Sequence, residues 1–353
     1  MIIMKIGLPF FYDLNLEGIL EKIIFSGHKI DQYQNILIDL PHGLGDQIMC
    51  LPLLKSLKRK YPNAKVTVLS PNKNSSELFR HLPCIDSYEL IDIKFTKFGL
   101  LCFLFKKYFS LRKFIVKNSF DLYLAPHYNP VRELFAKIFP FPTAIINKEH
   151  SHKIEGVENL LEFLGIEPDY DYSLKNICAS ETLEKFGLEY RKYIVLDRYP
   201  QHLKRDPRGW FYFDELVSRL KAEGYNAVLV GLNDNHVEIE GIVDLVNKTK
   251  FSELLDVLQG AQLVVSLDSG IFHFSYSLNT PVIGLFGPID PSSRLPKLEK
   301  NVYALYKRVS CSPCIKNRVD IKCKNSESSY LCMKSISSVD VMATIMEVLR
   351  NDV

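Results

Sequence analysis

The feature that most constrains the fold of this chain is a repeated alternation of short β-rich runs with segments of helical periodicity. The first buried run, at 35–39, is followed by apolar residues at helical spacing over 48–57. The same alternation continues through most of the sequence. It is typical of parallel sheets whose strands are joined by crossover helices, and it predicts an α/β fold.

The β-rich runs fall into two series on either side of a mixed polar segment at 165–184. At 353 residues the chain has the length for two α/β cores. We therefore predict two Rossmann-like domains that face each other across a cleft, an N-terminal domain at 1–170 and a C-terminal domain at 171–353. The first 34 residues are expected to add a strand or a helix to the first domain. The predicted strands are 35–39, 65–70, 121–124 and 143–146, then 193–197, 227–230, 262–266 and 281–286.

Charge and hydropathy restrict the classes of partner. The net charge of +3 is a small difference between 44 basic and 41 acidic residues, so it gives no argument for a nucleic-acid partner. Residues 1–5 lack the basic and apolar pattern of a signal peptide. The longest strongly apolar run, at 98–105, is far shorter than a membrane-spanning helix. These patterns predict a soluble, cytoplasmic protein.

A glycine-rich motif, Pro-His-Gly-Leu-Gly-Asp-Gln-Ile, follows the first predicted strand at 41–48. Gly43 and Gly45 allow a tight turn and a close approach of the backbone to a ligand, and the helix that follows offers free N–H groups. Asp46 falls at or near the N-cap of that helix. Two interpretations are open: a helix cap, which is the common role of aspartate there, or a general base at the mouth of the cleft. The motif by itself favours the cap.

A second motif, Asp-Ser-Gly-Ile-Phe-His, follows a predicted strand of the second domain at 268–273. Its serine hydroxyl and consecutive N–H groups could converge on one anion, which is the chemistry that a nucleotide diphosphate requires. His273 lies one turn further on, where it could donate to the same phosphates or serve only the structure. The predicted binding residues here are Asp268, Ser269, Gly270 and His273.

These blocks together resemble glycosyltransferase family 9, the ADP-heptose:acceptor heptosyltransferases. Gly-Leu-Gly-Asp, Asp-Ser-Gly-x-x-His, Leu-Phe-Gly-Pro-x-Asp-Pro, and Cys-x-Pro-Cys with a later Cys-Met occur in that order over residues 35–345. The resemblance implies a GT-B fold and transfer with inversion at the anomeric carbon, without a catalytic metal. It implies that Asp46 is the general base and that Asp268, Ser269 and Gly270 hold the sugar nucleotide. Gly43, Gly45 and Gly287 of the same blocks join the predicted substrate-binding residues.

A basic block, Lys-Arg-Asp-Pro-Arg-Gly-Trp, follows the first strand of the second domain at 204–210. The resemblance implies that Arg208, two positions before Trp210, is a phosphate ligand. A fixed cation there would stabilise the charge that grows on a departing diphosphate. Lys204 and Arg205 are the alternative cations, and Lys204 stays among the predicted binding residues. Trp210 is expected to be a packing residue.

Four cysteines lie close together near the C-terminus, opened by Cys-x-x-Cys. Four thiolates can complete a tetrahedral metal site, and the segment has too few apolar residues to form a core of its own. In some members of the family that modify autotransporter adhesins, a comparable cluster binds iron. We predict a structural zinc or iron with no open coordination position; the alternative is four packing thiols. The cysteines of this segment, 311–332, are Cys311, Cys314, Cys323 and Cys332.

The predicted function is transfer of a heptose, or a similar sugar, from a nucleotide diphosphate such as ADP-heptose to a hydroxyl acceptor. The acceptor is either lipopolysaccharide or another glycan, or a protein Ser or Thr. A non-catalytic scaffold that binds nucleotide sugar is the alternative. A basic amphipathic stretch at 94–117 allows either a peripheral contact with the inner face of a membrane or an ordinary surface helix. Self-association into a homo-oligomer also remains possible.

Overall fold

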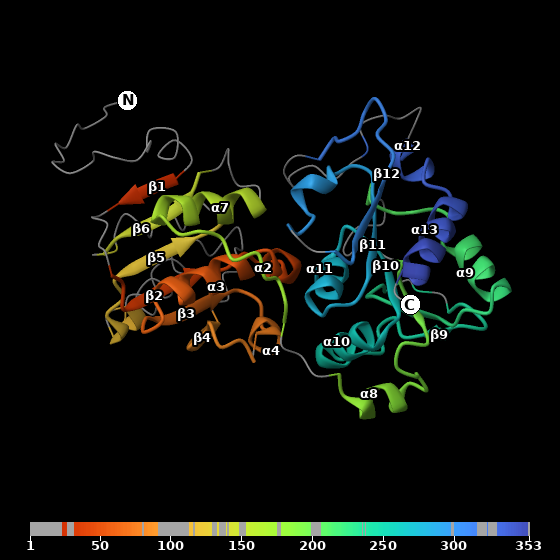
Figure 1. Cartoon of the computed structure of the whole chain (residues 1–353), viewed down its shortest axis with the longest axis horizontal. Helices are drawn as coiled ribbons and strands as arrows, with labels where there is room; N and C mark the ends of the chain where they lie inside the picture. The colour runs from red at the N-terminus through yellow and green to blue at the C-terminus, as the bar shows by residue number, and fades with distance from the viewer. Residues whose placement is uncertain are drawn as a thin grey trace.

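The protein folds into two lobes, each built around a six-stranded sheet, in a computed structural model (Figure 1). No helix in the described part of the chain is long and apolar enough to cross a membrane. The described residues are 23–26, 32–79, 81–90, 113–115, 117–128, 133, 139, 141–147, 153–174, 178–198, 206–234, 236, 238–297, 300–315, 323 and 330–351.

The first sheet has the strand order β1-β6-β5-β2-β3-β4. Its neighbours from β6 to β4 pair in parallel, whereas β1 joins the edge antiparallel to β6. Strand β1 is therefore the additional element that we expected from the first 34 residues. The strands are β1 (Ile23–Ser26), β2 (Asn35–Asp39), β3 (Lys65–Ser70), β4 (Ser87–Leu90), β5 (Leu122–Ala125) and β6 (Thr143–Ile146). The helices of this lobe are α2 (Leu44–Ile48), α3 (Leu51–Lys60), α4 (Ser75–Leu78) and α7 (Lys153–Leu164).

The second sheet is parallel throughout, in the order β12-β11-β10-β7-β8-β9. This is the 3-2-1-4-5-6 order of a Rossmann fold, which creates a binding crevice at the carboxyl ends of its central strands. Its strands are β7 (Ile194–Asp197), β8 (Ala227–Val230), β9 (Val243–Asp244), β10 (Leu263–Leu267), β11 (Val282–Phe286) and β12 (Val302–Tyr306). Its helices are α8 (Ser180–Lys185), α9 (Phe213–Ala222), α10 (Phe251–Gly260), α11 (Gly270–Ser277), the 3₁₀ turn η2 (Pro291–Ser293), α12 (Leu331–Lys334) and α13 (Ser338–Asn351).

The chain passes from the first lobe to the second after α7. Lys55 of α3 holds the connecting segment through an ion pair with Asp171 at 2.7 Å and a hydrogen bond to the Ser173 carbonyl at 2.8 Å. On the other side, the Leu174 N–H donates to the Ser277 carbonyl at the end of α11, at 2.7 Å. The linker is thus bound to a helix of each lobe.

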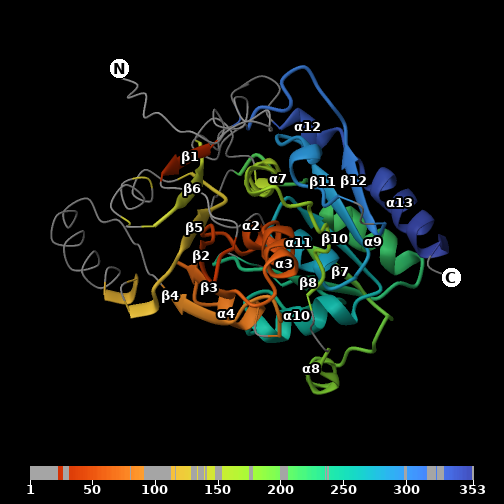
Figure 2. The same cartoon turned by 60° about the vertical axis from the view of Figure 1, so that its left-hand side comes forward.

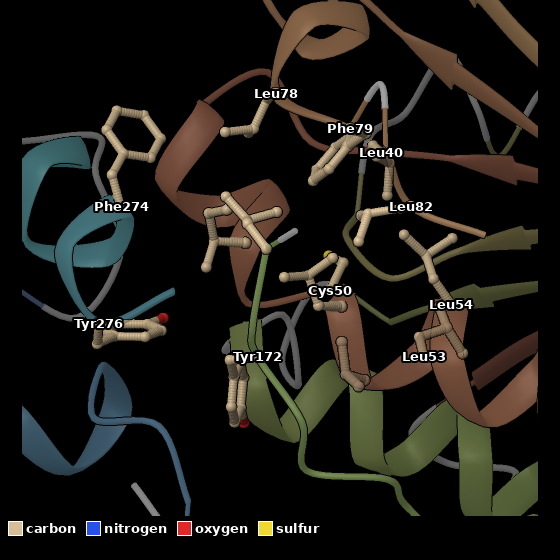
Figure 3. Close-up of a cluster of buried hydrophobic side chains, with 14 of the residues drawn as sticks. Leu40, Cys50, Leu53, Leu54, Leu78, Phe79, Leu82, Tyr172, Phe274 and Tyr276 are labelled. Atoms are coloured by element: carbon tan, nitrogen blue, oxygen red, sulfur yellow. The ribbon is translucent and has the colours of Figure 1, made fainter. Parts of the chain in front are cut away.

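The two lobes share one continuous apolar core. Figure 3 shows Leu40 and Cys50 of the first lobe on one side, Phe274 and Tyr276 of α11 on the other, and Tyr172 of the linker between them. In both cartoon views α2 and α11 lie side by side where the lobes meet (Figure 2). The contact between the lobes is therefore packed hydrophobically around these two helices.

Candidate active site

Asp46 lies in the first turn of α2, at the carboxyl end of β2. The N-cap residue is Gly43, so Asp46 is the third residue of the helix, near the N-cap but not the capping residue itself. The residue is only 5% exposed. A Cβ built on Gly43 would lie 2.8 Å from the Asp46 Oδ2, which shows that the carboxylate folds back over the helix N-terminus. Helix N–H groups stabilise a negative charge at this position.

Gly45 lies at the contact between the two domains. A Cβ on Gly45 would be 2.7 Å from the His273 Cδ2 and 3.2 Å from the Gly270 Cα, both on α11. We predicted that this glycine allows a close approach to a ligand; the close approach in the structure is to the other domain. The contact places Asp46, its neighbour in sequence, close to the N-terminus of α11.

Ser269 is the N-cap residue of α11, and its hydroxyl is fully engaged. The Ser269 Oγ accepts from the Ile271 N–H at 3.1 Å and donates to the Asp197 Oδ2 at 2.5 Å. Our prediction pointed this hydroxyl at an anion, but in the structure it donates its hydrogen bond to the Asp197 carboxylate. Apart from the Ile271 N–H, the N–H groups of the first helical turn are the donors that this geometry leaves for a ligand.

Asp197 is a site residue that the sequence analysis missed. It ends β7 beneath Ser269 and also accepts a hydrogen bond from the Ser266 hydroxyl at 2.8 Å. Burial raises the pKa of Asp197 to about 6, although the hydrogen bonds from both serines and the charge of Arg208 lower it in part. The available signal was an aspartate at the carboxyl end of an otherwise apolar strand.

Arg208 is held rigidly at the same edge of the sheet. Its Nε and Nη2 donate to the two carboxylate oxygens of Asp206, at 2.9 and 2.5 Å, and its Nη1 donates to the Asp268 carbonyl at 2.7 Å. Burial alone would lower the pKa of Arg208, but Asp206, with the charges of Asp268 and Asp197, raises it. A guanidinium has five N–H donors, so two are left for a ligand after these three bonds. Asp206 was not among the predicted residues.

Asp268 is turned inward and faces a second arginine. Its Oδ1 lies 3.5 Å from the Nε of Arg294, which follows η2, and both side chains are buried. Its Oδ2 is buried without a hydrogen-bond partner among the described residues. Arg294 also escaped sequence analysis, because it lies beyond the end of the recognised Leu-Phe-Gly-Pro-x-Asp-Pro block.

The remaining predicted binding residues are His273, Gly287 and Lys204. His273 is 3% exposed against Gly45, with its Nδ1 3.0 Å from the Tyr276 hydroxyl. Gly287 packs under α12, because a Cβ there would be 2.4 Å from the Met333 sulfur and 3.0 Å from the Cys332 sulfur. Lys204 and most of the 94–117 stretch lie outside the described residues.

Three of the C-terminal cysteines lie close enough to the fourth, Cys332, to affect its ionisation. Burial, and then the charges of Cys314, Cys311 and Cys323, raise the pKa of Cys332 to about 11, despite a hydrogen bond from Met333. The Tyr330 N–H donates to the Cys323 sulfur at 3.4 Å. Within the described ranges, no group of three or more His, Cys, Asp or Glu side chains is arranged to hold a metal ion. The metal therefore stays a prediction.

Comparison with known proteins identifies the family. The model of glycosyltransferase family 9 (heptosyltransferase) matches residues 151–324. Lipooligosaccharide heptosyltransferase 2 of Haemophilus influenzae is 24% identical over 310 residues, covering 75% of this chain and 87% of that protein. The structure of E. coli ADP-heptose lps heptosyltransferase II matches with a TM-score of 0.66 at 18% identity, over 90% of this chain and 99% of that one. The iron-containing dodecameric glycosyltransferase TibC of enterotoxigenic E. coli H10407 matches with a TM-score of 0.63 at 14% identity, over 92% and 78%.

The two structural matches have the GT-B fold, which confirms the predicted architecture of two Rossmann-like domains. The family motifs lie on the two helices that meet between these domains, Asp46 on α2 and the Asp-Ser-Gly turn before α11. This chain is a glycosyltransferase and belongs to glycosyltransferase family 9.

Proposed function

We propose that this enzyme transfers a heptose from ADP-heptose to a hydroxyl of a lipopolysaccharide core or a related glycan, with inversion at the anomeric carbon. The observation that carries the proposal is the meeting of two helix N-termini from opposite domains. One has a buried carboxylate in its first turn, and the other has a fixed arginine beside it. The similarity to a lipooligosaccharide heptosyltransferase and to a heptosyltransferase that uses ADP-heptose supports the choice of sugar and nucleotide.

The donor diphosphate is assigned to the second domain. The first N–H groups of α11 point toward the carboxyl edge of the sheet, where a helix N-terminus favours an anion. Arg208 adds a fixed positive charge, because Asp206 and the Asp268 carbonyl orient its guanidinium. As the bond to the sugar breaks, negative charge grows on the departing ADP, and this preorganised cation stabilises it.

The acceptor is assigned to the first domain. Asp46 takes the proton from the acceptor hydroxyl, and the oxygen attacks the anomeric carbon from the face opposite the departing ADP. Because the helix of Asp46 contacts the helix of the donor site, base and donor are held in one arrangement. The apolar packing around them limits the access of water, which would otherwise hydrolyse the donor.

A donor screen tests this proposal. The purified chain is incubated with ADP-heptose and a panel of other nucleotide sugars, with a truncated lipopolysaccharide core or a Ser/Thr-containing peptide as acceptor, and products are identified by mass spectrometry. We expect transfer from ADP-heptose to the core oligosaccharide. Transfer only to the peptide would reassign the acceptor to protein. Donor binding without transfer or hydrolysis would favour the non-catalytic scaffold.

We also propose a structural metal at the four-cysteine segment. Its donor set of four thiols fits a soft ion such as zinc or iron, and the fold match to the iron-containing TibC supports the comparison. Cys311, Cys314, Cys323 and Cys332 would hold the ion. The ion would cross-link the three earlier cysteines to Cys332 on α12. With four thiolate ligands it would have no coordination position left for a substrate.

Metal analysis of anaerobically purified protein is expected to give about one equivalent of zinc or iron per chain. Changing both Cys311 and Cys314 to serine should remove the metal and lower the melting temperature, because the segment loses its cross-link. ADP affinity of the folded fraction should stay the same, because the donor residues lie elsewhere. The double change of Cys50 and Cys84 to alanine is the control: it removes two buried thiols of the first domain and should leave metal content unchanged. Protein without metal would identify the four cysteines as packing residues.

A further inference from the structure

We propose that Gly45 and His273 are positioning residues whose contact sets the spacing between the two domains and thereby the reach of Asp46 to the donor. The inference rests on the proposed function and deepens it. Gly45 belongs to α2 of the first domain and His273 to α11 of the second. Neither residue needs to touch a substrate for this role.

The contact leaves no room for a side chain on Gly45. A Cβ would lie 2.7 Å from the His273 Cδ2, a separation that real Cβ atoms do not show, and 3.2 Å from the Gly270 Cα. One of these neighbours belongs to the backbone and cannot rotate away. The φ angle of Gly45 is in the ordinary range for any residue, so the need for glycine here comes from the other domain.

The His273 ring cannot easily move away from Gly45, because it is buried and contacts Tyr276. It is 3% exposed, and its Nδ1 lies at hydrogen-bond distance, 3.0 Å, from the Tyr276 hydroxyl. The Tyr276 ring in turn packs edge-on against Tyr172 of the linker, with centroids 5.8 Å apart (Figure 3). Close-packed groups of this kind transmit a displacement rather than absorb it. A methyl group on Gly45 would therefore push the two helices apart.

Such a displacement would move Asp46, the next residue along α2. Its carboxylate is fixed in the first turn of that helix, so it moves with the helix and not independently. The donor groups Arg208, Gly270 and the N-terminus of α11 move with the other domain. A displacement of about 1 Å between a catalytic group and its substrate can cost on the order of 100-fold in rate. The distance between α2 and α11 at Gly45 should therefore affect the turnover of transfer but not the affinity for the donor.

The test compares transfer, ADP binding and amide hydrogen exchange in the full chain. We expect Gly45→Ala to lower the turnover of transfer by roughly 10- to 100-fold and to leave the Kd for ADP within about threefold. Hydrogen exchange should rise in both 44–48 and 270–277, although only the first segment is altered. Adding His273→Ala to Gly45→Ala should recover part of the turnover, because it vacates the space that the new methyl needs.

Two further variants separate spacing from other roles of His273. His273→Phe places a larger ring against Gly45 and should reproduce the loss of turnover. Lys297→Ala is the interface control: it removes an exposed ion pair with Glu158 between the domains, which is worth little, and adds no bulk at the contact. We expect its turnover to change less than about twofold.

Several outcomes would overturn the inference. Wild-type turnover in Gly45→Ala, or exchange that rises only around α2, would show that the contact does not set the spacing. A Kd for ADP that rises in step with the loss of turnover would make Gly45 or His273 part of the donor site instead. If the wild-type chain transfers no sugar at all, the proposed function fails, but the exchange measurement still decides whether the contact couples the two helices.

Discussion

Asp46→Asn is expected to lower the turnover of transfer by roughly 10²- to 10⁴-fold, which is the range typical for loss of a general base. The amide keeps the shape of the side chain over the α2 N-terminus but cannot take the acceptor proton. The Kd for ADP should be nearly unchanged, because the residues assigned to the diphosphate belong to the other domain. Steady-state kinetics with ADP-heptose and titration with ADP measure the two effects separately.

The control for Asp46 is an acidic residue at the same helical position away from the site. Glu253 is the third residue of α10, where its carboxylate accepts the Lys250 N–H at 2.8 Å. Glu253→Gln should cost a little thermal stability and leave turnover intact. If Asp46→Asn behaves in the same way, Asp46 only stabilises its helix and the base must be sought elsewhere.

Arg208→Ala is expected to weaken ADP binding and to slow transfer by roughly 10²- to 10³-fold, the cost of removing one preorganised donor to a developing negative charge. Arg208→Lys should recover little of this loss, because lysine keeps the charge without the paired donors that Asp206 orients. Lys204→Ala should have little effect on either quantity. Isothermal titration with ADP and steady-state kinetics provide the measurement.

Arg208→Ala alone also leaves the buried Asp206 carboxylate without its partner, and an unpaired buried charge destabilises a protein strongly. The double variant Asp206→Asn with Arg208→Ala removes both charges. Its melting temperature should lie above that of the single variant, while its affinity for ADP should stay low. Wild-type ADP affinity in the double variant would remove Arg208 from the donor site.

Much of the fold could be predicted because its signals are local. Strands β2, β3, β6 and β8 have the predicted bounds, since buried parallel strands are continuous apolar runs. The outer strands β4 and β12 were missed: β4 carries mixed residues and is partly exposed, whereas β12 is an apolar run that the sequence analysis did not assign to a strand. The interval between the two series of strands likewise marks where the chain passes from one sheet to the other.

The sequence by itself determined which residues stand at the turns after the central strands: Asp46 after β2, and Ser269 with Gly270 after β10. Those positions follow from short-range order along the chain. Only the tertiary structure decided what each side chain touches. In the folded chain the Ser269 hydroxyl donates to Asp197, Arg208 pairs with Asp206, and Gly45 packs against another helix instead of a ligand. The reason is physical: hydrogen bonds, ion pairs and close packing depend on distance in space, and these partners meet only when both sheets have formed and packed together.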